Sequence, residues 1–505
     1  MSDKSLARTL GFATAAIMAL TQAPVGFVRD EGYYFTAAQS YESWLRLLLQ
    51  APLQAIAQTE RYWSYNFEHP GLTKLLFAAS HLVFTTWLGA LPDALAWRLP
   101  AFAFAGLLSY WLSLLGLSRS RAAGVLAPLL FWCAERTFFH GHLACFDIPI
   151  CAMWAGVGLA WLRGTGPRLA GTYGLALAVK HNAWFLPPVL LVHALLLPRE
   201  QRNAALRKLP WLLLSPLVLF AAWPLLWHDP LRHLGDWIAF HTHHVHYAWW
   251  YFGQVLRAPP FPVSYPLVLD ALVLPLPIAA MLAAAGVSLL VGFARRRLDA
   301  QRLLELGLAG AALLPFLLRT TPIFGGIKHW LAFLALLAPE AASLLVRAAS
   351  EPRKLMAAAL ATLLPGFWQI VHVHPYGTSA YGELAGGTPG AATLGMQRQY
   401  WSNNVTGVLP WLNSHCPLGA RVYFHEVNVE SYHAYILAGL LRPDIHYASD
   451  PEQSDYAALQ WHREFRDREP QTWNAFGTRR PATGLYLDEV PQVVVYARPG
   501  LPGAP

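Results

Sequence analysis

Two adjacent carboxylates, Asp30 and Glu31, follow closely after an apolar stretch at residues 10–28 that has the length of a membrane helix. Holding both charges at the border of a low-dielectric region costs free energy, because like charges repel and burial disfavours ionisation. A cation, a basic side chain or a reacting substrate would offset that cost. The pair is therefore a candidate catalytic site, with a plain polar cap on a hydrophobic segment as the alternative.

Other polar clusters interrupt the apolar sequence and supply the groups that phosphates and cations need. Lysine and histidine can neutralise a phosphate, and carboxylates can hold a divalent cation. The candidate phosphate-binding residues are His69, Lys180, His181, Lys328 and His329. The candidate ligands for a divalent cation (Mg, Mn or Zn) are Glu68 and Asp147. Taken singly, the two lysines also fit side chains that extend to lipid headgroups.

A segment rich in histidine and aromatic residues follows at 241–253. Aromatic residues gather at membrane interfaces, so an interfacial belt is one interpretation. Imidazole also suits zinc or copper, but the HxHHxH spacing is not a standard zinc pattern. We interpret the segment as a loop that contacts substrate, with the candidates His244, His246, Tyr247, Trp250 and Tyr251.

The composition indicates what must position these residues. The chain has 505 residues, of which 55% are hydrophobic and only 13% are charged, against about 25% charged in soluble domains. This predicts a polytopic membrane protein. The net charge of +8 comes from short basic clusters between apolar runs, which indicates membrane topology and no nucleic-acid partner. The four cysteines show neither metal-ligand spacing nor a disulfide framework.

The apolar runs predict about 11 membrane spans and one helix lying against the outer leaflet at 72–91. The spans are 9–28, 98–117, 122–139, 148–163, 169–180, 183–197, 209–227, 266–293, 303–318, 327–347 and 355–373. Every second connection is basic, which places these loops and the N-terminus in the cytoplasm. The polar clusters then share the outer side. Counting 72–91 as a crossing would reverse this arrangement.

The hydrophobic runs stop after residue 374. Alternating patterns predict strands at 421–426 and 492–497, and residues 455–468 are predicted as a helix. The chain thus divides into a transmembrane domain, 1–373, with outer loops 29–97, 140–147 and 228–265, and a small outer α/β domain, 374–505. The predicted fold class is an all-α polytopic membrane protein with a small soluble α/β domain.

An ordered set of motifs resembles the protein O-mannosyltransferase and aminoarabinose-transferase superfamily of polyprenyl-phosphate-sugar glycosyltransferases. The motifs are Arg29-Asp30-Glu31, Glu68-His69-Pro70-Gly71-Leu72, Arg98-Leu99-Pro100, Asp147, the run from Gly174 to Lys180-His181, and Tyr265-Pro266. The resemblance implies a GT-C fold with a catalytic acid in the first outer loop. It implies that Asp30 is the catalytic aspartate, that Asp147 is the second-loop acid and that Lys180 is the helix-break lysine. Two positions depart from the family pattern: His69 stands where lysine is common, and Gly71 where a second proline is common.

The predicted function is transfer of a sugar from a polyprenyl-phosphate donor to a lipid, glycan or protein acceptor in the bacterial inner membrane. Asp30 would act as general base in an inverting displacement. The absence of a glycine-rich phosphate loop from the sequence favours a lipid-linked donor over a nucleotide sugar. The alternatives are a multi-span transporter, whose ionisable residues would lie near the midplane, an O-antigen ligase or polymerase-like protein, and a metal-binding protein built on the histidine segment.

Overall fold

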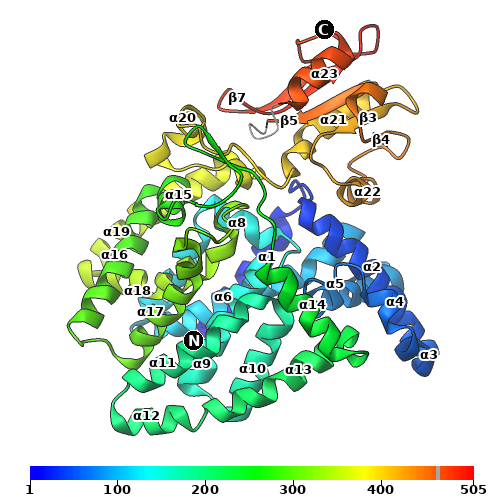
Figure 1. Ribbon diagram of the computed structural model, residues 1–505. Coiled ribbons are helices and arrows are strands. Elements are labelled where there is room, and N and C mark those ends of the chain that lie inside the picture. The colour runs from blue at the N-terminus through cyan, green and yellow to red at the C-terminus, as the bar shows by residue number, and fades with distance from the viewer. Residues whose placement is uncertain (462–466) are drawn as a thin grey trace.

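The computed structural model describes residues 1–461 and 467–505 as a large helical body with a small sheet-containing domain at one end. In Figure 1 the C-terminal sheet lies above the helices, and the N-terminus lies toward the opposite end of the body. The region where the body meets this domain contains the first residues of helix α2 (Arg29–Gln50), and therefore the Asp30-Glu31 pair.

The helical body consists of many packed elements joined by short connections. They begin with α1 (Asp3–Thr21), α2, α3 (Pro52–Ala57), α4 (Thr59–Trp63), α5 (Leu72–His81), the π-helical turn η1 (Leu82–Trp87), α6 (Asp93–Leu117), α7 (Arg121–Trp132), α8 (Glu135–His142), α9 (Asp147–Arg163) and α10 (Gly166–Val179). They continue with η2 (His181–Phe185), α11 (Leu186–Leu196), α12 (Arg199–Leu206), η3 (Leu209–Leu214), α13 (Ser215–Ala222), η4 (Pro224–Trp227), α14 (Pro230–Thr242), α15 (Tyr265–Val273), α16 (Leu276–Ala294), α17 (Ala300–Leu313), η5 (Leu314–Leu317), η6 (Gly326–Trp330), α18 (Leu331–Ala348) and α19 (Pro352–Val373). A short hairpin, β1 (Trp249–Tyr251) and β2 (Gln254–Leu256), lies between α14 and α15.

Within the described residues, six helical segments are long and apolar enough to cross a membrane, or up to seven if one bent pair counts as a single span. The six are Asp93–Leu117, Arg199–Ala222, Leu276–Ala294, Ala300–Leu317, Gly326–Ala348 and Pro352–Val373. The bent pair, α7 and α8, turns by 83° where the sequence predicts one span at 122–139. The count of about 11 spans therefore stays a prediction. The break predicted at 180–182 is present, because Lys180 is extended between α10 and η2.

The apolar stretch 10–28 is not one helix, in contrast to the prediction. Helix α1 ends at Thr21, and residues 22–28 form a turn and an extended segment before α2. The Arg98 side chain explains the extended part, since it donates hydrogen bonds to the carbonyl oxygens of Val25 and Gly26, each at 2.9 Å. Buried carbonyls need such partners once they leave a helix.

The C-terminal domain contains a five-stranded sheet in the order β4-β3-β5-β7-β6. Strand β3 pairs in parallel with β4 and β5, while β7 pairs antiparallel with β5 and β6. Its elements are η7 (Gly377–Ser379), η8 (Glu383–Ala385), α20 (Gly387–Thr393), η9 (Asn403–Val408), α21 (Leu409–His415), β3 (Arg421–Phe424), α22 (Val429–Leu437), β4 (His446–Ala448), η10 (Pro451–Gln453), β5 (Tyr456–Gln460), α23 (Arg468–Phe476), β6 (Thr483–Leu487) and β7 (Val490–Ala497).

Both predicted strands of this domain are confirmed by β3 and β7, but the predicted helix at 455–468 is wrong at its start. Residues 456–460 form the central strand β5, and all five are buried. A short apolar run does not distinguish strand from helix by its period, and burial between two neighbouring strands decides the outcome. Residues 462–466 of that prediction lie outside the described part of the chain.

The C-terminal domain docks on the helical body beside the first turn of α2. The Tyr435 hydroxyl of α22 accepts a hydrogen bond from the Phe27 amide at 3.0 Å and donates to the Phe27 carbonyl at 3.1 Å. Ser431 donates to the Val28 carbonyl at 3.2 Å. A side chain at Gly32 would come within 2.6 Å of the Ser431 backbone, so glycine permits this close packing. The docking contacts therefore fix the segment that carries Asp30.

Candidate functional site

Asp30 lies in the first turn of α2 and pairs with a lysine that is distant in sequence. The Lys328 ammonium, in η6 just before α18, lies 3.4 Å from a carboxylate oxygen of Asp30. Lys328 is buried, whereas the side chain of Asp30 keeps about a quarter of its surface exposed (27%). The positive end of the α2 dipole and this ammonium both lie beside the carboxylate. Asp30 is thus an accessible anion at the edge of the helical body.

A second acid–lysine pair joins the start of α9 to the end of α10. The Lys180 ammonium donates to an Asp147 carboxylate oxygen at 2.7 Å, and both side chains are buried. Lys180 reaches this position because α10 ends before it and the chain becomes extended. The site therefore contains two lysines, and each of them is paired with one carboxylate.

Histidines from five separate segments lie near these pairs, and several of their ring nitrogens have no hydrogen-bond partner within the described residues. The His181 and His241 rings stack at 3.6 Å between centroids, and His69 lies 5.6 Å from His241. Nδ1 of His69, Nδ1 of His181, Nε2 of His329 and both ring nitrogens of His140 are buried and unpaired. Unpaired buried polar atoms are costly, so several at one place indicate a site that a ligand completes.

Burial and the neighbouring His241 hold the pKa of His69 well below its usual value. Burial likewise lowers the pKa of His241 to about 4. Both rings are therefore neutral at pH 7, and the positive charge of the site resides on the lysines. This neutrality bears on the departure from the family pattern, because a neutral imidazole at position 69 can donate a hydrogen bond to a phosphate but cannot neutralise it.

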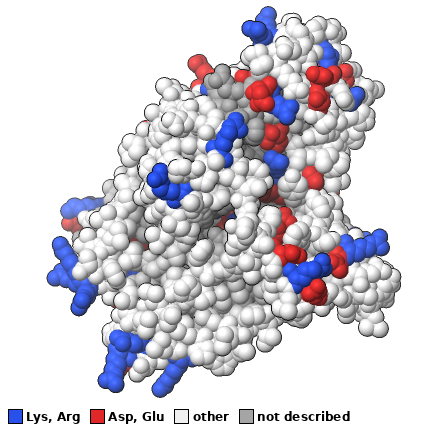
Figure 2. Space-filling view, viewed as in Figure 1, with Lys and Arg blue, Asp and Glu red and all other residues white. Residues whose placement is uncertain are grey.

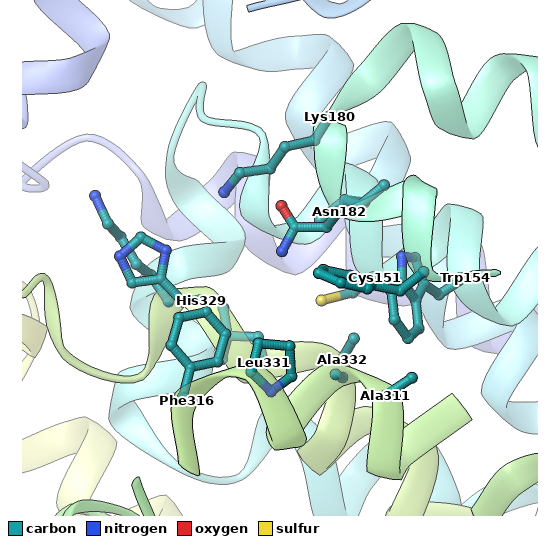
Figure 3. Close-up of a pocket in the computed structure, with 14 residues that line it drawn as sticks. Cys151, Trp154, Lys180, Asn182, Ala311, Phe316, His329, Leu331 and Ala332 are labelled. Carbon is teal, nitrogen blue, oxygen red and sulfur yellow. The ribbon is translucent and has the colours of Figure 1, made fainter. Parts of the chain in front are cut away.

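A cavity lies between the two lysines and the apolar helix faces beneath them. Its polar lining is formed by Lys180, Asn182, Lys328 and His329, and its apolar lining includes Ile150, Cys151, Trp154, Phe316, Leu331 and Ala332. Figure 3 shows Lys180 and Asn182 entering from one side and the apolar side chains of α9, η5 and α18 lining the remainder. The cavity is small, about 10 Å³, with cationic groups at one end and apolar side chains at the other.

Glu31 does not face this cavity. Its two oxygens accept hydrogen bonds from Nε and Nη2 of Arg98, both at 2.8 Å, and also from the Ala144 amide at 2.9 Å and the Val28 amide at 3.1 Å. Glu31 is fully buried. It therefore ties α2, α6 and the loop before α9 together and has no free oxygen aimed at a ligand. This geometry does not favour the catalytic role predicted for Glu31.

The two acids predicted to hold a cation do not form a cation site. Asp147 is paired with Lys180, and Glu68 accepts a hydrogen bond from the Asn66 side chain at 2.5 Å. Among residues 1–461 and 467–505, no group of three or more histidine, cysteine, aspartate or glutamate side chains is placed to hold a metal ion. The residues present do not fit a divalent cation, and no chemical step is derived through one.

The predicted substrate loop divides into two parts. His244 and Tyr247 pack on Phe324, with centroids 5.4 and 5.0 Å away, and Phe324 in turn lies 5.7 Å from the Lys328 ammonium. Tyr247 is more than half exposed at 53%. The structure thus brings these two residues to the outer edge of the site.

The other three candidates of the loop serve the β1–β2 hairpin. The His246 ring bonds to the carbonyl of Leu256 at 3.1 Å, and the Trp250 amide donates to Gln397 at 3.0 Å. Tyr251 packs on Tyr265 at 5.1 Å. These contacts hold the hairpin in place, and His246 also packs at 5.9 Å on Phe324, the ring that lies beside the Lys328 ammonium.

Two residues that the sequence did not single out contact the site. Lys74 of α5 is fully buried and donates to the His69 carbonyl at 3.1 Å, and burial lowers its pKa to about 7. A lone lysine in the apolar run 72–91 was the available signal. Trp401 of the C-terminal segment places its ring 4.1 Å from the Lys328 ammonium. No local pattern marks this contact, because it joins positions 73 residues apart in the chain.

The fold, a helical body with a small C-terminal domain, is similar to that of solved structures. The chain aligns with the crystal structure of ArnT from Cupriavidus metallidurans bound to undecaprenyl phosphate, at a TM-score of 0.53 and 15% identity over 96% of this chain and 97% of that chain. The apo structure of the same protein gives a TM-score of 0.54 at the same identity and coverage. No protein-family model matches the chain, and no curated protein matches it by sequence. The alignment confirms the GT-C fold that the motifs implied.

Proposed function

We propose that this protein is a membrane glycosyltransferase that moves a sugar from a polyprenyl-phosphate donor to an acceptor. The observation that carries the proposal is the cavity with two lysines at one end and an apolar lining at the other. Lysine ammonium groups form strong charge-assisted hydrogen bonds to phosphate, and the apolar helix faces beside the lysines suit a polyprenyl chain that stays in the bilayer. The likeness in fold to a protein crystallised with undecaprenyl phosphate supports the same ligand class.

In the proposed reaction an acceptor hydroxyl attacks the anomeric carbon of the donor sugar. Asp30 takes the hydroxyl proton, the new glycosidic bond forms, and the bond from the anomeric carbon to the phosphate oxygen breaks with its electron pair leaving on the phosphate. Lys180 and Lys328 meet the charge that develops on this leaving group. Attack opposite the leaving group inverts the anomeric configuration.

The histidines would contribute hydrogen bonds to this site. His69 is neutral, so it would donate to a phosphate or sugar oxygen without adding charge. His181 and His329 each carry an unpaired buried ring nitrogen beside the lysines. A ligand that accepts or donates at these nitrogens would satisfy them and gain affinity.

We further propose that the site faces the periplasm and that the N-terminus is cytoplasmic in a bacterial inner membrane. Arginines at the other ends of the helices support this orientation, since basic residues favour the cytoplasmic side. They are Arg119 at the end of α6, Arg163 at the end of α9 and Arg347 at the end of α18. The acceptor would then be an envelope lipid, glycan or protein, and the sugar a hexose or pentose.

The test is turnover of a labelled polyprenyl-phosphate sugar by Asp30→Asn in the purified protein. Asparagine keeps the shape but cannot accept the proton, so we expect turnover to fall by about 10²–10⁴-fold. Asp3→Asn is the matched control, because Asp3 is an exposed first-turn acid of α1. Thermal unfolding of both variants checks that the fold is kept. Wild-type turnover by a folded Asp30→Asn protein would refute the assignment of the base.

A further inference from the structure

The C-terminal segment places the face of an aromatic ring directly against the cation of the site. The Lys328 ammonium lies 4.1 Å from the centroid of Trp401, well inside the roughly 6 Å at which a cation is attracted to an aromatic face. Phe324 is the second ring near this ammonium, at 5.7 Å. Lys328 therefore lies between an aromatic surface and the Asp30 carboxylate.

The geometry points to Trp401 as the positioning residue for Lys328, through which the C-terminal domain sets the phosphate-binding end of the donor site. This inference rests on the proposed function, and it assigns to the C-terminal domain a part in the reaction beyond covering the site.

The backbone at Trp401 is held in a conformation that bulky residues rarely adopt. Trp401 and the following Ser402 have φ values of 68° and 66°, and two consecutive left-handed residues without glycine are unfavourable. Such strain persists only where surrounding contacts fix it, and it gathers at functional positions.

Contacts from both domains fix this strained turn. The Trp401 carbonyl accepts from the amide of Arg29, the residue before Asp30, at 3.0 Å. From the sheet domain, the Gln460 side chain of β5 donates to the Ser402 carbonyl at 3.0 Å, and Ser402 donates to the Glu426 carbonyl at 2.5 Å. One turn thus connects the sheet, the start of α2 and the lysine.

The aliphatic stem of Lys328 is also closely packed. Gly325 has φ 81°, and a side chain there would come within 2.5 Å of the Lys328 stem. The absence of a side chain at Gly325 lets the lysine lie against the backbone. On another side Trp401 meets the buried His140 ring at 5.4 Å, whose nitrogens are both unpaired. The indole therefore lies between the lysine and a polar group that also awaits a partner.

An aromatic face suits this task because it holds a cation without using its hydrogen bonds. An ammonium has three N–H donors, and attraction to the indole ring leaves them available. In the free enzyme the ammonium lies beside Asp30. When the donor phosphate binds, the same ammonium can turn its donors to the phosphate while it stays over the ring. Asp30 is then released to accept the acceptor's proton.

The experiment is a double-mutant cycle between Trp401 and Lys328, measured as kcat and KM for the donor sugar. We expect Trp401→Leu to lower kcat/KM about tenfold, in the upper part of the range for a partly desolvated cation–π contact. Trp401→Phe should retain an intermediate value, because phenylalanine attracts a cation less strongly than tryptophan. In a Lys328→Met background, Trp401→Leu should cause no further loss, because the group that it positions is gone.

Trp411→Leu is the matched control, since Trp411 is a partly buried tryptophan of the same domain that stacks on His415 at 4.4 Å. It should leave kcat/KM unchanged. Losses from Trp401→Leu and Lys328→Met that simply add would overturn the inference, as would wild-type kinetics of Trp401→Leu. If Trp401→Leu does not fold, the Trp401→Phe cycle decides in the same way. Failure of the folded wild-type protein to turn over any polyprenyl-phosphate sugar would instead contradict the proposed function, and the same cycle measured as affinity for undecaprenyl phosphate would then decide the coupling between Trp401 and Lys328.

Discussion

The two ends of the helical body both carry buried charges, but they are satisfied in opposite ways. At the lysine end, Asp30 and Asp147 each pair with one lysine, and nearby histidine nitrogens lack partners within the described residues. At the arginine end, the fully buried Glu340 is bound by Arg302 at 2.7 Å and by Arg347 at 3.2 Å, and it accepts from the Ser288 hydroxyl at 2.8 Å. Arg119 pairs with Glu305 and also lies 3.5 Å from Glu340.

The same helices connect the two ends. The ends therefore differ in how their charged groups are paired, although they belong to the same part of the fold. Lys328 and Glu340 are 12 residues apart, which corresponds to about 18 Å along a helix. Arginine side chains surround the Glu340 carboxylate and join α16, α17 and α18, while Nη1 of Arg119 has no partner within the described residues. The lysine end leaves donors and acceptors open. Figure 2 shows basic side chains along the lower edge of the molecule, while acidic groups gather toward the junction with the C-terminal domain.

The largest expected loss of stability is that of Glu340→Gln, which tests the arginine end. The substitution removes the buried negative charge that the partly buried Arg302 and the exposed Arg347 share, so we expect a loss of about 3 kcal/mol in stability. Thermal unfolding in detergent measures the loss. Because the cluster is structural, transfer per folded molecule should stay near the wild-type value. A stable Glu340→Gln protein with lost turnover would show that the arginine end takes part in the reaction.

The second is Arg98→Lys, which tests the structural support of the lysine end. Arg98 donates to both Glu31 oxygens and to two carbonyls of residues 22–28. A lysine keeps the charge but loses the planar fork, and we expect a loss of about 2–3 kcal/mol. Turnover should fall as well, since Glu31 directly follows Asp30 in the first turn of α2. Arg297→Lys, at an exposed position, is the control. Unchanged stability and turnover in Arg98→Lys would contradict the structural role of Glu31.

The third and smallest effect is the pH dependence of stability. His241 has a folded-state pKa of about 4, below the usual 6.5, because it is buried. The unfolded chain therefore binds the proton first, and stability falls as the pH drops from 6.5 toward 4. At pH 5 we expect a cost of about 1–2 kcal/mol from this ring. The His241→Gln protein should show a shallower decline in melting temperature between pH 7 and pH 5, and an identical decline would count against the burial of a neutral histidine.

Much of the fold could be predicted from the sequence, because long apolar helices and alternating strands leave strong local patterns. The break at Lys180 followed from a polar interruption in an apolar run, and strands β3 and β7 followed from alternation. The central strand β5 did not, since its short run Tyr-Ala-Ala-Leu-Gln fits either period and only the neighbouring strands decide.

The site could be predicted only in part, since residue type does not reveal which groups are already satisfied. Glu31 and Asp30 are adjacent, yet one is fully bound by Arg98 and the other remains accessible. Pairings such as Asp30 with Lys328, and the contact of Lys328 with Trp401, depend on long-range packing that leaves no spacing in the sequence.

The assignment of the lysine end as the donor site is tested by binding of undecaprenyl phosphate to the purified protein, measured by native mass spectrometry. Two double variants that each remove two positive charges are compared: Lys180→Met with Lys328→Met, and Arg163→Met with Arg347→Met. We predict that the lysine variant loses at least about tenfold in affinity, while the arginine variant binds like the wild type. Wild-type binding by a folded lysine variant, or loss confined to the arginine variant, would contradict the assignment of the lysine end as the donor site.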